Sequence, residues 1–206
     1  DKTHEFATGA GNGITVNGVL ASNGLSTNPS ILRSVADAAT DWELTLNGSS
    51  TLVDKVSVKH SDASSGLDVY AMGSIDSGNN SSWAFSAPTI SSITSLTADG
   101  FYSNGTNITI KVKFSHGITL VGTMGVNLDS GGVVVINAFT GSSATGSYLV
   151  GSGQVSPDLN AVSVSVTGTA KDALLNDLIL TMPVTNIATG SAIVIDTAVP
   201  TITSIT

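Results

Sequence analysis

The segment from Asn107 to Phe114, NITIKVKF, alternates apolar and polar residues with a period of two. Successive side chains of a β-strand point to opposite faces, so this alternation predicts a strand with one buried face. The segment from Ala161 to Gly168, AVSVSVTG, repeats the pattern with valines and serines. The two segments therefore predict sheets with one buried face in the second half of the chain.

Further apolar segments, separated by turn-type residues, extend this pattern. Strands are predicted at 125–128, 133–139, 147–150, 178–181 and 192–196, and turns rich in Gly, Asn, Ser and Asp at 98–106, 128–132, 139–147 and 151–160. Short strands separated by such turns are typical of a two-sheet sandwich. The segment 170–180 contains one helical turn at most, because its apolar residues continue directly into a strand pattern.

The composition agrees with an all-β fold and argues against several partners. Only 11% of the residues are charged, and 15 acidic residues against 7 basic ones give a net charge of −8. The basic residues are spread along the chain, which argues against binding to nucleic acid or to an anionic membrane. No apolar run approaches the ~18 residues of a membrane span, so no membrane insertion is expected. Without cysteine there are no disulfides, and a start at Asp1 indicates a processed chain or a fragment.

The first 86 residues show a different pattern of apolar and polar residues. Short apolar pairs and triplets, as in GITVNGVLAS and DWELTLNG, are each followed by Asn, Gly or Ser. Short strands with small polar corners suit a parallel β-helix, in which stacked coils bury an aliphatic interior. A second, irregular sandwich is the alternative. A domain boundary is expected at Ser86 to Pro88, which gives domains at 1–86 and 87–198.

The second region resembles the immunoglobulin-like repeats found in tandem in large bacterial surface proteins and adhesins. The resemblance rests on APTISSIT, ADGFYSNGTNITIKVKFS, GSGQVSPDLN, TAKDALLNDLILTMP and AIVIDTAVPT, in this order over about 120 residues. It implies an immunoglobulin-like β-sandwich, and a location outside the cell, either at the cell surface or secreted.

The first region, about 10–86, resembles the C-terminal coils of right-handed parallel β-helix passenger-like domains of secreted bacterial proteins. The matching phrases are NPSILRSVADAATDWELTLNGSSTLVDKVSVKHSDASSG and DSGNNSSWAF. This resemblance implies that Trp83 and Phe85 cap the open end of the stack. Together with Pro88, they are expected to pack between the two domains.

Calcium is the cofactor that the resemblance suggests. In tandem immunoglobulin-like adhesins, the Asp of the junction phrase helps to hold a calcium ion between neighbouring repeats, and here that residue is Asp196. Asp99, Asp172 and Asp177 are expected companions in loops, and oxygen ligands of this kind suit calcium. The segment ALLN replaces the usual AAGN after Asp172, which counts against a metal role for that loop.

The last eight residues of the chain closely repeat an earlier segment. VPTITSIT at 199–206 matches APTISSIT at 87–94 in six of eight positions. The segment is therefore expected to open a following repeat, or to pair as a donor strand with a neighbouring molecule. The residues of this predicted self-association strand are Val199, Pro200, Thr201, Ile202, Thr203, Ser204, Ile205 and Thr206.

No catalytic residue is predicted. His4, His60 and His116 stand in three different contexts, and no Gly-x-Ser-x-Gly motif occurs. The leading expectation is a non-enzymatic extracellular segment of a repetitive bacterial surface protein, acting as a stalk or adhesin module. One alternative is a self-assembling fibre or surface-layer subunit, and a second is a carbohydrate-binding module. The expected partners are neighbouring repeats, identical subunits, or a surface glycan or a receptor on a host or prey cell.

Overall fold

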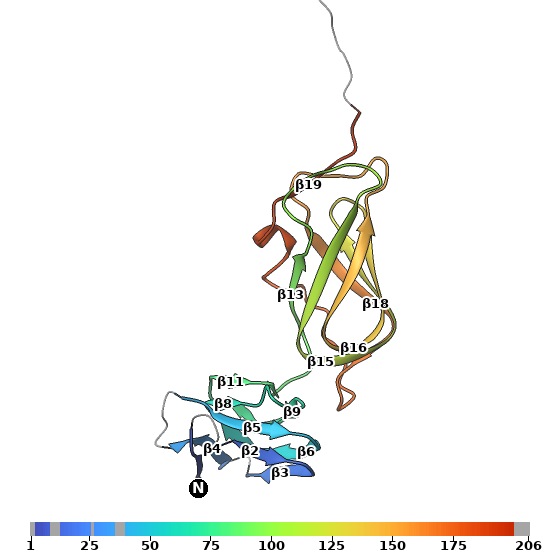
Figure 1. Cartoon of the computed structure of the whole chain (residues 1–206). Helices are drawn as coiled ribbons and strands as arrows, with labels where there is room; N and C mark the ends of the chain where they lie inside the picture. Colours follow the sequence, from blue (N-terminus) through green and yellow to red (C-terminus); the bar gives the residue numbers. More distant parts are fainter. Residues whose placement is uncertain (1–2, 9–12, 26, 36–39, 200–206) are drawn as a thin grey trace, which may run out of the picture. The chain divides into compact units, whose positions relative to one another are not determined.

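The chain is all β and forms two compact units, Asp1–Ala87 and Pro88–Thr206. A computed structural model describes residues 3–8, 13–25, 27–35 and 40–199 (Figure 1). These residues form β-strands and a short 3-10 helix, η2 (Ile187–Thr189), and none of them is in an α-helix. The all-β prediction is therefore confirmed. The sequence placed the division between residues 86 and 87.

Unit 1 is built from short strands that pair in parallel. They are β1 (Thr3–Phe6), β2 (Ile14–Val16), β3 (Val19–Asn23), β4 (Ser30–Ser34), β5 (Trp42–Leu46), β6 (Ser49–Asp54), β7 (Val56–Val58), β8 (Ser61–Asp62), β9 (Val69–Tyr70), β10 (Ile75–Asp76), β11 (Asn80–Ser81) and β12 (Trp83–Ala84). One column has the order β1-β4-β7-β10 and a second has the order β2-β5-β8-β11. The remaining strands pair as β3 with β6 and β9 with β12. Every pair between these strands is parallel.

The interior of unit 1 is filled by alternate side chains of these strands. In β4 and β5 the buried residues occupy every second position. Leu44, Leu46, Val56 and Val58 are each at most 2% exposed. A strand too short to be stable alone is thus held by the strand above and the strand below it, which share one apolar interior.

Unit 2 is dominated by two long antiparallel strands. Its elements are β13 (Ile90–Ser95), β14 (Gly100–Tyr102), β15 (Asn107–Leu128), β16 (Val133–Leu149), β17 (Val155–Ser156), β18 (Ala161–Lys171), η2 and β19 (Ile193–Asp196). The register between β15 and β16 shifts between Lys113 and Ile118, where both strands bend. The first half of β15 pairs with β13 and with the second half of β16. Its second half pairs with the first half of β16 and with β18, so the two strands contribute to both layers.

The core of unit 2 lies between these two layers. Ile108, Ile110 and Val112 face it from the first half of β15, and Met124 and Val126 from the second half, all at 0% exposure. The alternation predicted for 107–114 is therefore confirmed. A third sheet joins β14, β19 and β17 at the end of the unit where β19 is labelled in Figure 1.

Several local predictions for unit 2 are wrong. The segments 98–106 and 151–160 are predicted as turns, but they contain the short strands β14 and β17, which both pair with β19. The segment 139–147 is predicted as a turn, but it belongs to β16 and pairs with β15 on both sides of a register shift between Gly141 and Ser143. The segment 178–181 was predicted as a strand, but Leu178 N–H donates to Ala170 O and Ile179 N–H donates to Pro88 O. Its backbone groups are thus divided between β18 and the segment that leads into β13, and no continuous ladder forms.

Candidate functional site

Asp196 and Asp99, two of the residues expected to bind calcium, lie at opposite ends of β19. Asp196 is the last residue of β19, and its Oδ1 accepts a hydrogen bond from Ala198 N–H at 2.9 Å. Asp99 Oδ1 accepts from Ala192 N–H at 2.8 Å, just before β19 begins. Four residues of strand separate these two places, about 13 Å at ~3.3 Å per residue. The two carboxylates therefore do not share one site.

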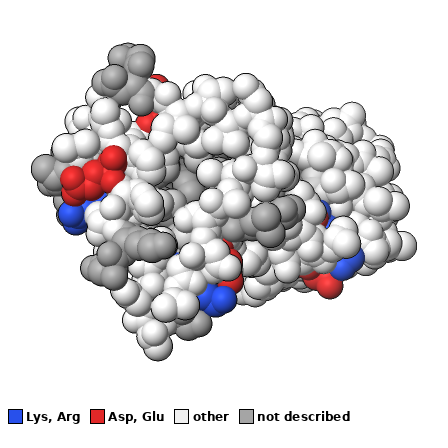
Figure 2. All heavy atoms as spheres, turned by 90° about the horizontal axis from the view of Figure 1, so that it is seen from below, with Lys and Arg blue, Asp and Glu red and all other residues white. Residues whose placement is uncertain are grey.

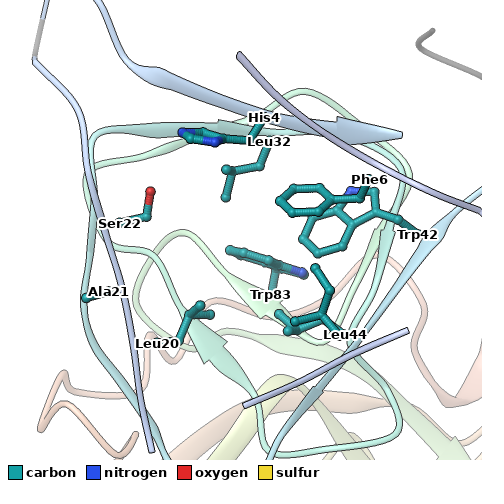
Figure 3. A pocket seen from close by; sticks show the side chains of 10 residues that line it. His4, Phe6, Leu20, Ala21, Ser22, Leu32, Trp42, Leu44 and Trp83 are labelled. Atoms are coloured by element: carbon teal, nitrogen blue, oxygen red, sulfur yellow. The ribbon is translucent and has the colours of Figure 1, made fainter. Parts of the chain in front are cut away.

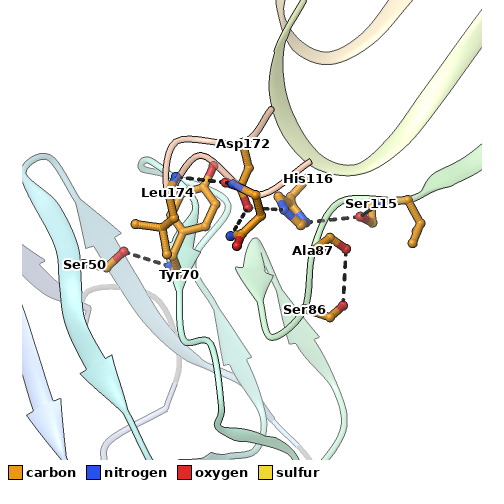
Figure 4. A network of polar contacts seen from close by, with 10 residues as sticks. Ser50, Tyr70, Ser86, Ala87, Ser115, His116, Asp172 and Leu174 are labelled. Atoms are coloured by element: carbon orange, nitrogen blue, oxygen red, sulfur yellow. Dashed lines mark hydrogen bonds and ion pairs between the residues drawn. The ribbon is translucent and has the colours of Figure 1, made fainter. Parts of the chain in front are cut away.

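Asp172 is the best-enclosed carboxylate that the structure describes, with a side chain at 0% exposure. Its Oδ1 accepts hydrogen bonds from Leu174 N–H and Asn176 N–H, both at 2.9 Å. Its Oδ2 accepts from Asn176 Nδ2 at 2.8 Å. The carboxylate thus organises its own loop (Figure 4), because a buried charge is tolerated only when it is well hydrogen-bonded.

His116 connects this loop to the bend of β15. Its Nε2 lies 3.5 Å from Asp172 Oδ2, and its Nδ1 lies 3.1 Å from Ser115 Oγ, which itself accepts from Thr89 N–H. Figure 4 shows the three side chains in one row. This contact joins residues 56 positions apart, and the sequence analysis did not predict it. The row holds the bend of β15 against the loop that follows β18.

Asp177, the fourth expected calcium ligand, lies on the surface of the same loop. Its Oδ1 forms a 2.6 Å ion pair with Lys171 Nζ, and its side chain is 80% exposed. Lys171 Nζ also donates to Leu175 O. Across the residues that the structure describes, no three His, Asp or Glu side chains come together in a way that could hold a metal ion. The four expected ligands are therefore distributed over three places, and calcium binding stays a prediction.

Of the two aromatic residues expected to cap unit 1, Trp83 is buried in its core and Phe85 is half-buried against it. Trp83 is 9% exposed, and its Nε1 donates to Ser61 Oγ at 2.9 Å. Trp42 contacts Trp83 edge-on at 6.3 Å between ring centroids, and Phe85 stacks on Trp83 at 6.0 Å. Phe6 stacks on the far side of Trp42 at 4.3 Å. Sequence reasoning missed Trp42, which links the aromatic rings of the first and last turns of unit 1.

Pro88, the third residue of the expected interdomain contact, belongs to unit 2, where its carbonyl accepts from Ile179 N–H. The interdomain role of Trp83, Phe85 and Pro88 stays a prediction. The expected self-association strand at 199–206 lies outside the described residues except for Val199, whose side chain is 82% exposed.

An apolar cavity of about 270 Å³ lies beside these aromatic rings in unit 1 (Figure 3). Its walls include Phe6, Leu20, Trp42 and Trp83, and its polar side chains are those of His4 and Ser22. The lining residues that the structure describes include no Asp, Glu, Lys or Arg, and most of them are apolar.

Charged side chains are sparse on the surface. On the face shown in Figure 2, the few Lys and Arg side chains lie next to Asp or Glu. Ion pairs in unit 1 include Arg33 with Glu5 at 2.8 Å and Lys55 with Asp54 at 3.0 Å. No helix among the described residues has the length and apolar character needed to cross a membrane.

A second hollow lies in unit 2, between the two halves of β16. It has a volume of about 510 Å³ and is lined only by residues of 135–140 and 143–147. The polar residues of its lining are uncharged: Asn137, Thr140, Ser143, Thr145 and Ser147. We call this feature the β16 hollow.

Two glycines lie beside the β16 hollow. Gly141, between the two halves of β16, has a φ of 151°. In the second half, Gly146 approaches the first half of the strand so closely that an added Cβ would lie 2.7 Å from Val135 O. Only glycine permits this approach. Phe139 supports the wall by stacking on Phe114 at 5.7 Å between ring centroids. From the sequence, part of this region, 139–147, is predicted as a turn.

Comparison with known proteins gives no relative: no protein family, no curated protein and no solved structure matches the chain.

Proposed function

We propose that this chain is a non-enzymatic structural and adhesive segment of a repetitive extracellular surface protein. In this proposal, unit 1 is the end of a right-handed parallel β-helix and unit 2 is an immunoglobulin-like sandwich. The role is that of a stalk or adhesin module, in which stiff units carry a binding surface away from the cell.

The parallel columns of unit 1 support the first part of the proposal. Three strands follow one another before the chain returns to the first column, so that β1, β4, β7 and β10 stack in order. A parallel β-helix has this pairing, whereas a sandwich of hairpins pairs its strands in antiparallel fashion.

The strand β13 is the observation that best supports a tandem array. It contains most of the phrase APTISSIT, and it places Ile90 at 4% and Ile93 at 0% exposure in the core of unit 2. The same phrase recurs at 199–206, with Ile202 and Ile205 in the matching positions. The recurring phrase therefore has the residues that the first strand of a second sandwich needs.

The hydrogen bonds that the aspartate side chains accept support a structural role rather than an enzymatic one. Asp62, Asp76, Asp172 and Asp196 each accept a hydrogen bond from the N–H two residues further along the chain. This is the Asx-turn, in which an aspartate fixes the path of its own loop. Aspartates so engaged stabilise turns between strands.

A hybrid chain tests the array. Residues 95–198 are appended directly after Thr206, so that 199–206 takes the place of β13 in a second sandwich. The expected result is a folded second copy, seen as a second set of dispersed amide resonances and a cooperative thermal transition of the added part.

Two control chains make this test specific. In one, residues 199–206 are deleted before the appended copy. In the other, Ile202→Asp and Ile205→Asp place charges at the positions that match Ile90 and Ile93, whose burial is shown for β13. Both controls are expected to leave the appended copy unfolded. Folding of the appended copy in all three chains would refute the assignment of 199–206 as a first strand.

The strand-exchange alternative predicts a different result for the single chain. A donor strand would join copies into oligomers, so light scattering would give a larger mass for 1–206 than for 1–198. Equal masses for both lengths remove this alternative. Equal masses would not argue against the proposal of a tandem array.

In this proposal, calcium binds only at the junction between neighbouring repeats, with Asp196 as one of its ligands. An extracellular module of this kind binds calcium with a dissociation constant on the order of 10⁻⁴–10⁻³ M. The test is a thermal melt of the hybrid chain with millimolar calcium and then with chelator. An unchanged midpoint removes calcium from the proposal.

A further inference from the structure

We propose that the β16 edge, the side of Ser143–Leu149 that faces away from β15, pairs with an extended acidic strand of a partner protein. The partner strand would extend the sheet formed by β13, β15 and the second half of β16. Strand addition of this kind takes its affinity from main-chain hydrogen bonds and its selectivity from side chains. The inference concerns unit 2 alone and goes beyond the proposed array.

The first argument concerns the backbone groups of this edge. Val150 N–H donates to Thr106 O, and Gly105 N–H donates to Val150 O, so the backbone of Val150 faces β15. This orientation alternates along an antiparallel strand. The N–H and C=O groups that therefore point away from β15 are those of Ser143, Thr145, Ser147 and Leu149. Among the described residues, β16 pairs with β15 and with no other strand.

The opposite edge of the same sheet is covered. Ile93 N–H donates to Thr185 O, and Thr89 forms a bridge with Ile179, so the segment 179–185 lies along β13. Natural proteins prevent edge pairing with charges, proline or a covering segment. No Asp, Glu, Lys, Arg or Pro occurs in the whole of β16, and the structure describes no segment paired with its outer side. One edge of the sheet is thus protected, and the other is suited to receive a strand.

The second argument is charge. Lys111 and Lys113 of β15 pair with Thr145 and Ser143 of β16, and both lysines lie on the outer face because the residues that alternate with them are buried. Neither lysine has a carboxylate partner within 4.0 Å among the described residues, whereas Lys171 on β18 forms an ion pair. Two positive charges on this face therefore favour a partner that carries carboxylates.

A strand on the β16 edge would bring its carboxylates within reach of these two lysines. Neighbouring strands lie ~4.8 Å apart, which places the partner strand about 10 Å from β15. The residues in between are Ser143 and Thr145, whose short side chains leave the space above them to longer ones. Alternate side chains of a strand point to the same face. Two glutamates two residues apart on the partner would therefore match the spacing of Lys111 and Lys113.

A second copy of this chain fits the edge less well than an acidic partner. Two β16 edges paired about a two-fold axis would place the lysines of both copies on one face of the joined sheet. The segment 199–206, VPTITSIT, has the composition of a strand but carries no carboxylate. Neither pairing supplies the negative charge that the lysines favour.

The test is an NMR titration of the ¹⁵N-labelled chain with three capped seven-residue peptides, in which Thr alternates with Glu, with Gln or with Lys. The Glu peptide is expected to shift the amide resonances of 143–149 and to slow the hydrogen exchange of Thr145 and Ser147. It is expected to bind about three- to tenfold more tightly than the Gln peptide, as two exposed ion pairs allow. Lys111→Ser combined with Lys113→Ser is expected to remove this difference.

Proline variants test whether backbone pairing produces the binding. Thr145→Pro removes an outward N–H and is expected to leave unit 2 folded, because an edge strand tolerates proline there. The loss of that hydrogen bond is expected to weaken binding of the Glu peptide by about fivefold. Ser147→Pro repeats the change at a second outward position. Ala144→Pro removes an N–H that faces β15 and is expected to destabilise unit 2 in urea. The matched charge control is Lys171→Ser, which is expected to leave peptide binding unchanged.

Five results would overturn the proposal. The first is that no peptide binds, and the second is that both outward proline variants bind the Glu peptide as the original chain does. The third is that Thr145→Pro and Ser147→Pro unfold unit 2 as Ala144→Pro does. The fourth is that an oligogalacturonate binds and the peptides do not, which would assign the lysines to an anionic glycan. The fifth is that a VPTITSIT peptide binds as tightly as the Glu peptide, which would assign the edge to the end of this chain.

These measurements use the single chain and do not depend on a second sandwich. The folding of the appended copy in the hybrid chain is measured separately, so the array proposal and the acidic-strand proposal can fail independently.

Discussion

Replacement of Asp172 by alanine tests whether one buried carboxylate organises an end of unit 2. Asp172→Ala removes three hydrogen bonds to its own loop and the 3.5 Å contact with His116 Nε2. Each hydrogen bond to a charged group contributes about 1.5–3 kcal/mol, but water can reach the half-buried loop after the change. We expect a net loss of about 2–4 kcal/mol in the free energy of unfolding of unit 2.

The two units can be followed separately, because both tryptophans, Trp42 and Trp83, lie in unit 1. Tryptophan fluorescence therefore reports unit 1, and far-UV circular dichroism reports both units. In urea, Asp172→Ala is expected to move the circular dichroism transition of unit 2 to lower concentration and to leave the fluorescence transition in place. A loss of 2–4 kcal/mol corresponds to a melting point lower by roughly 8–16 °C for a unit of this size.

Asp177→Ala is the matched control, because this carboxylate lies in the same loop and its side chain is 80% exposed. An exposed ion pair contributes ~0–1 kcal/mol, so the control is expected to change little. Equal losses for the two variants would refute the argument, as would a shift of the fluorescence transition by the same amount.

Two further predictions concern a close contact and a pH dependence. Gly132→Ala places a Cβ 2.1 Å from the Tyr148 ring and is expected to lower the stability of unit 2 by about 1–3 kcal/mol in urea unfolding, whereas Gly190→Ala meets no atom within 4 Å and should be neutral. Hydrogen bonds from the Ser64 hydroxyl and then from its backbone N–H hold the pKa of Asp62 below its ordinary value. A lowered pKa stabilises the folded state above the unfolded pKa of ~3.9, and this stabilisation is lost as the pH falls through the folded pKa. Asp62→Asn should therefore destabilise unit 1 in fluorescence-monitored unfolding at neutral pH, and equal stability of the two proteins there would refute the role of these bonds.

Much of the strand content follows from local patterns. The alternation of Ile108, Ile110 and Val112 with polar residues predicted a strand buried on one face, and all three are at 0% exposure. The turn predicted at 128–132 lies between β15 and β16, and the strand predicted at 192–196 is observed at 193–196. These features need only the geometry of one strand and the turn preference of Gly, Asn and Asp.

The segment 139–147 shows where local patterns fail. Its Gly, Ser and Thr residues favour turns, but Ser143 to Ser147 pair with Lys113 to Thr109 of β15. Strand formation there depends on a partner strand about 30 residues away, and side-chain preference alone cannot include that partner. The same holds for His116 and Asp172, whose contact depends on the course of β15 and β18.

The sequence by itself determined that the chain forms strands, which side of several strands is buried, and that one phrase occurs twice. These are properties of short windows, set by the period of two and by turn residues. Only the tertiary structure decided which strands pair, that β15 and β16 serve both layers of unit 2, and that the two halves of β16 line one hollow. Pairing is decided by which distant segments can share one buried core, and no short window contains that information.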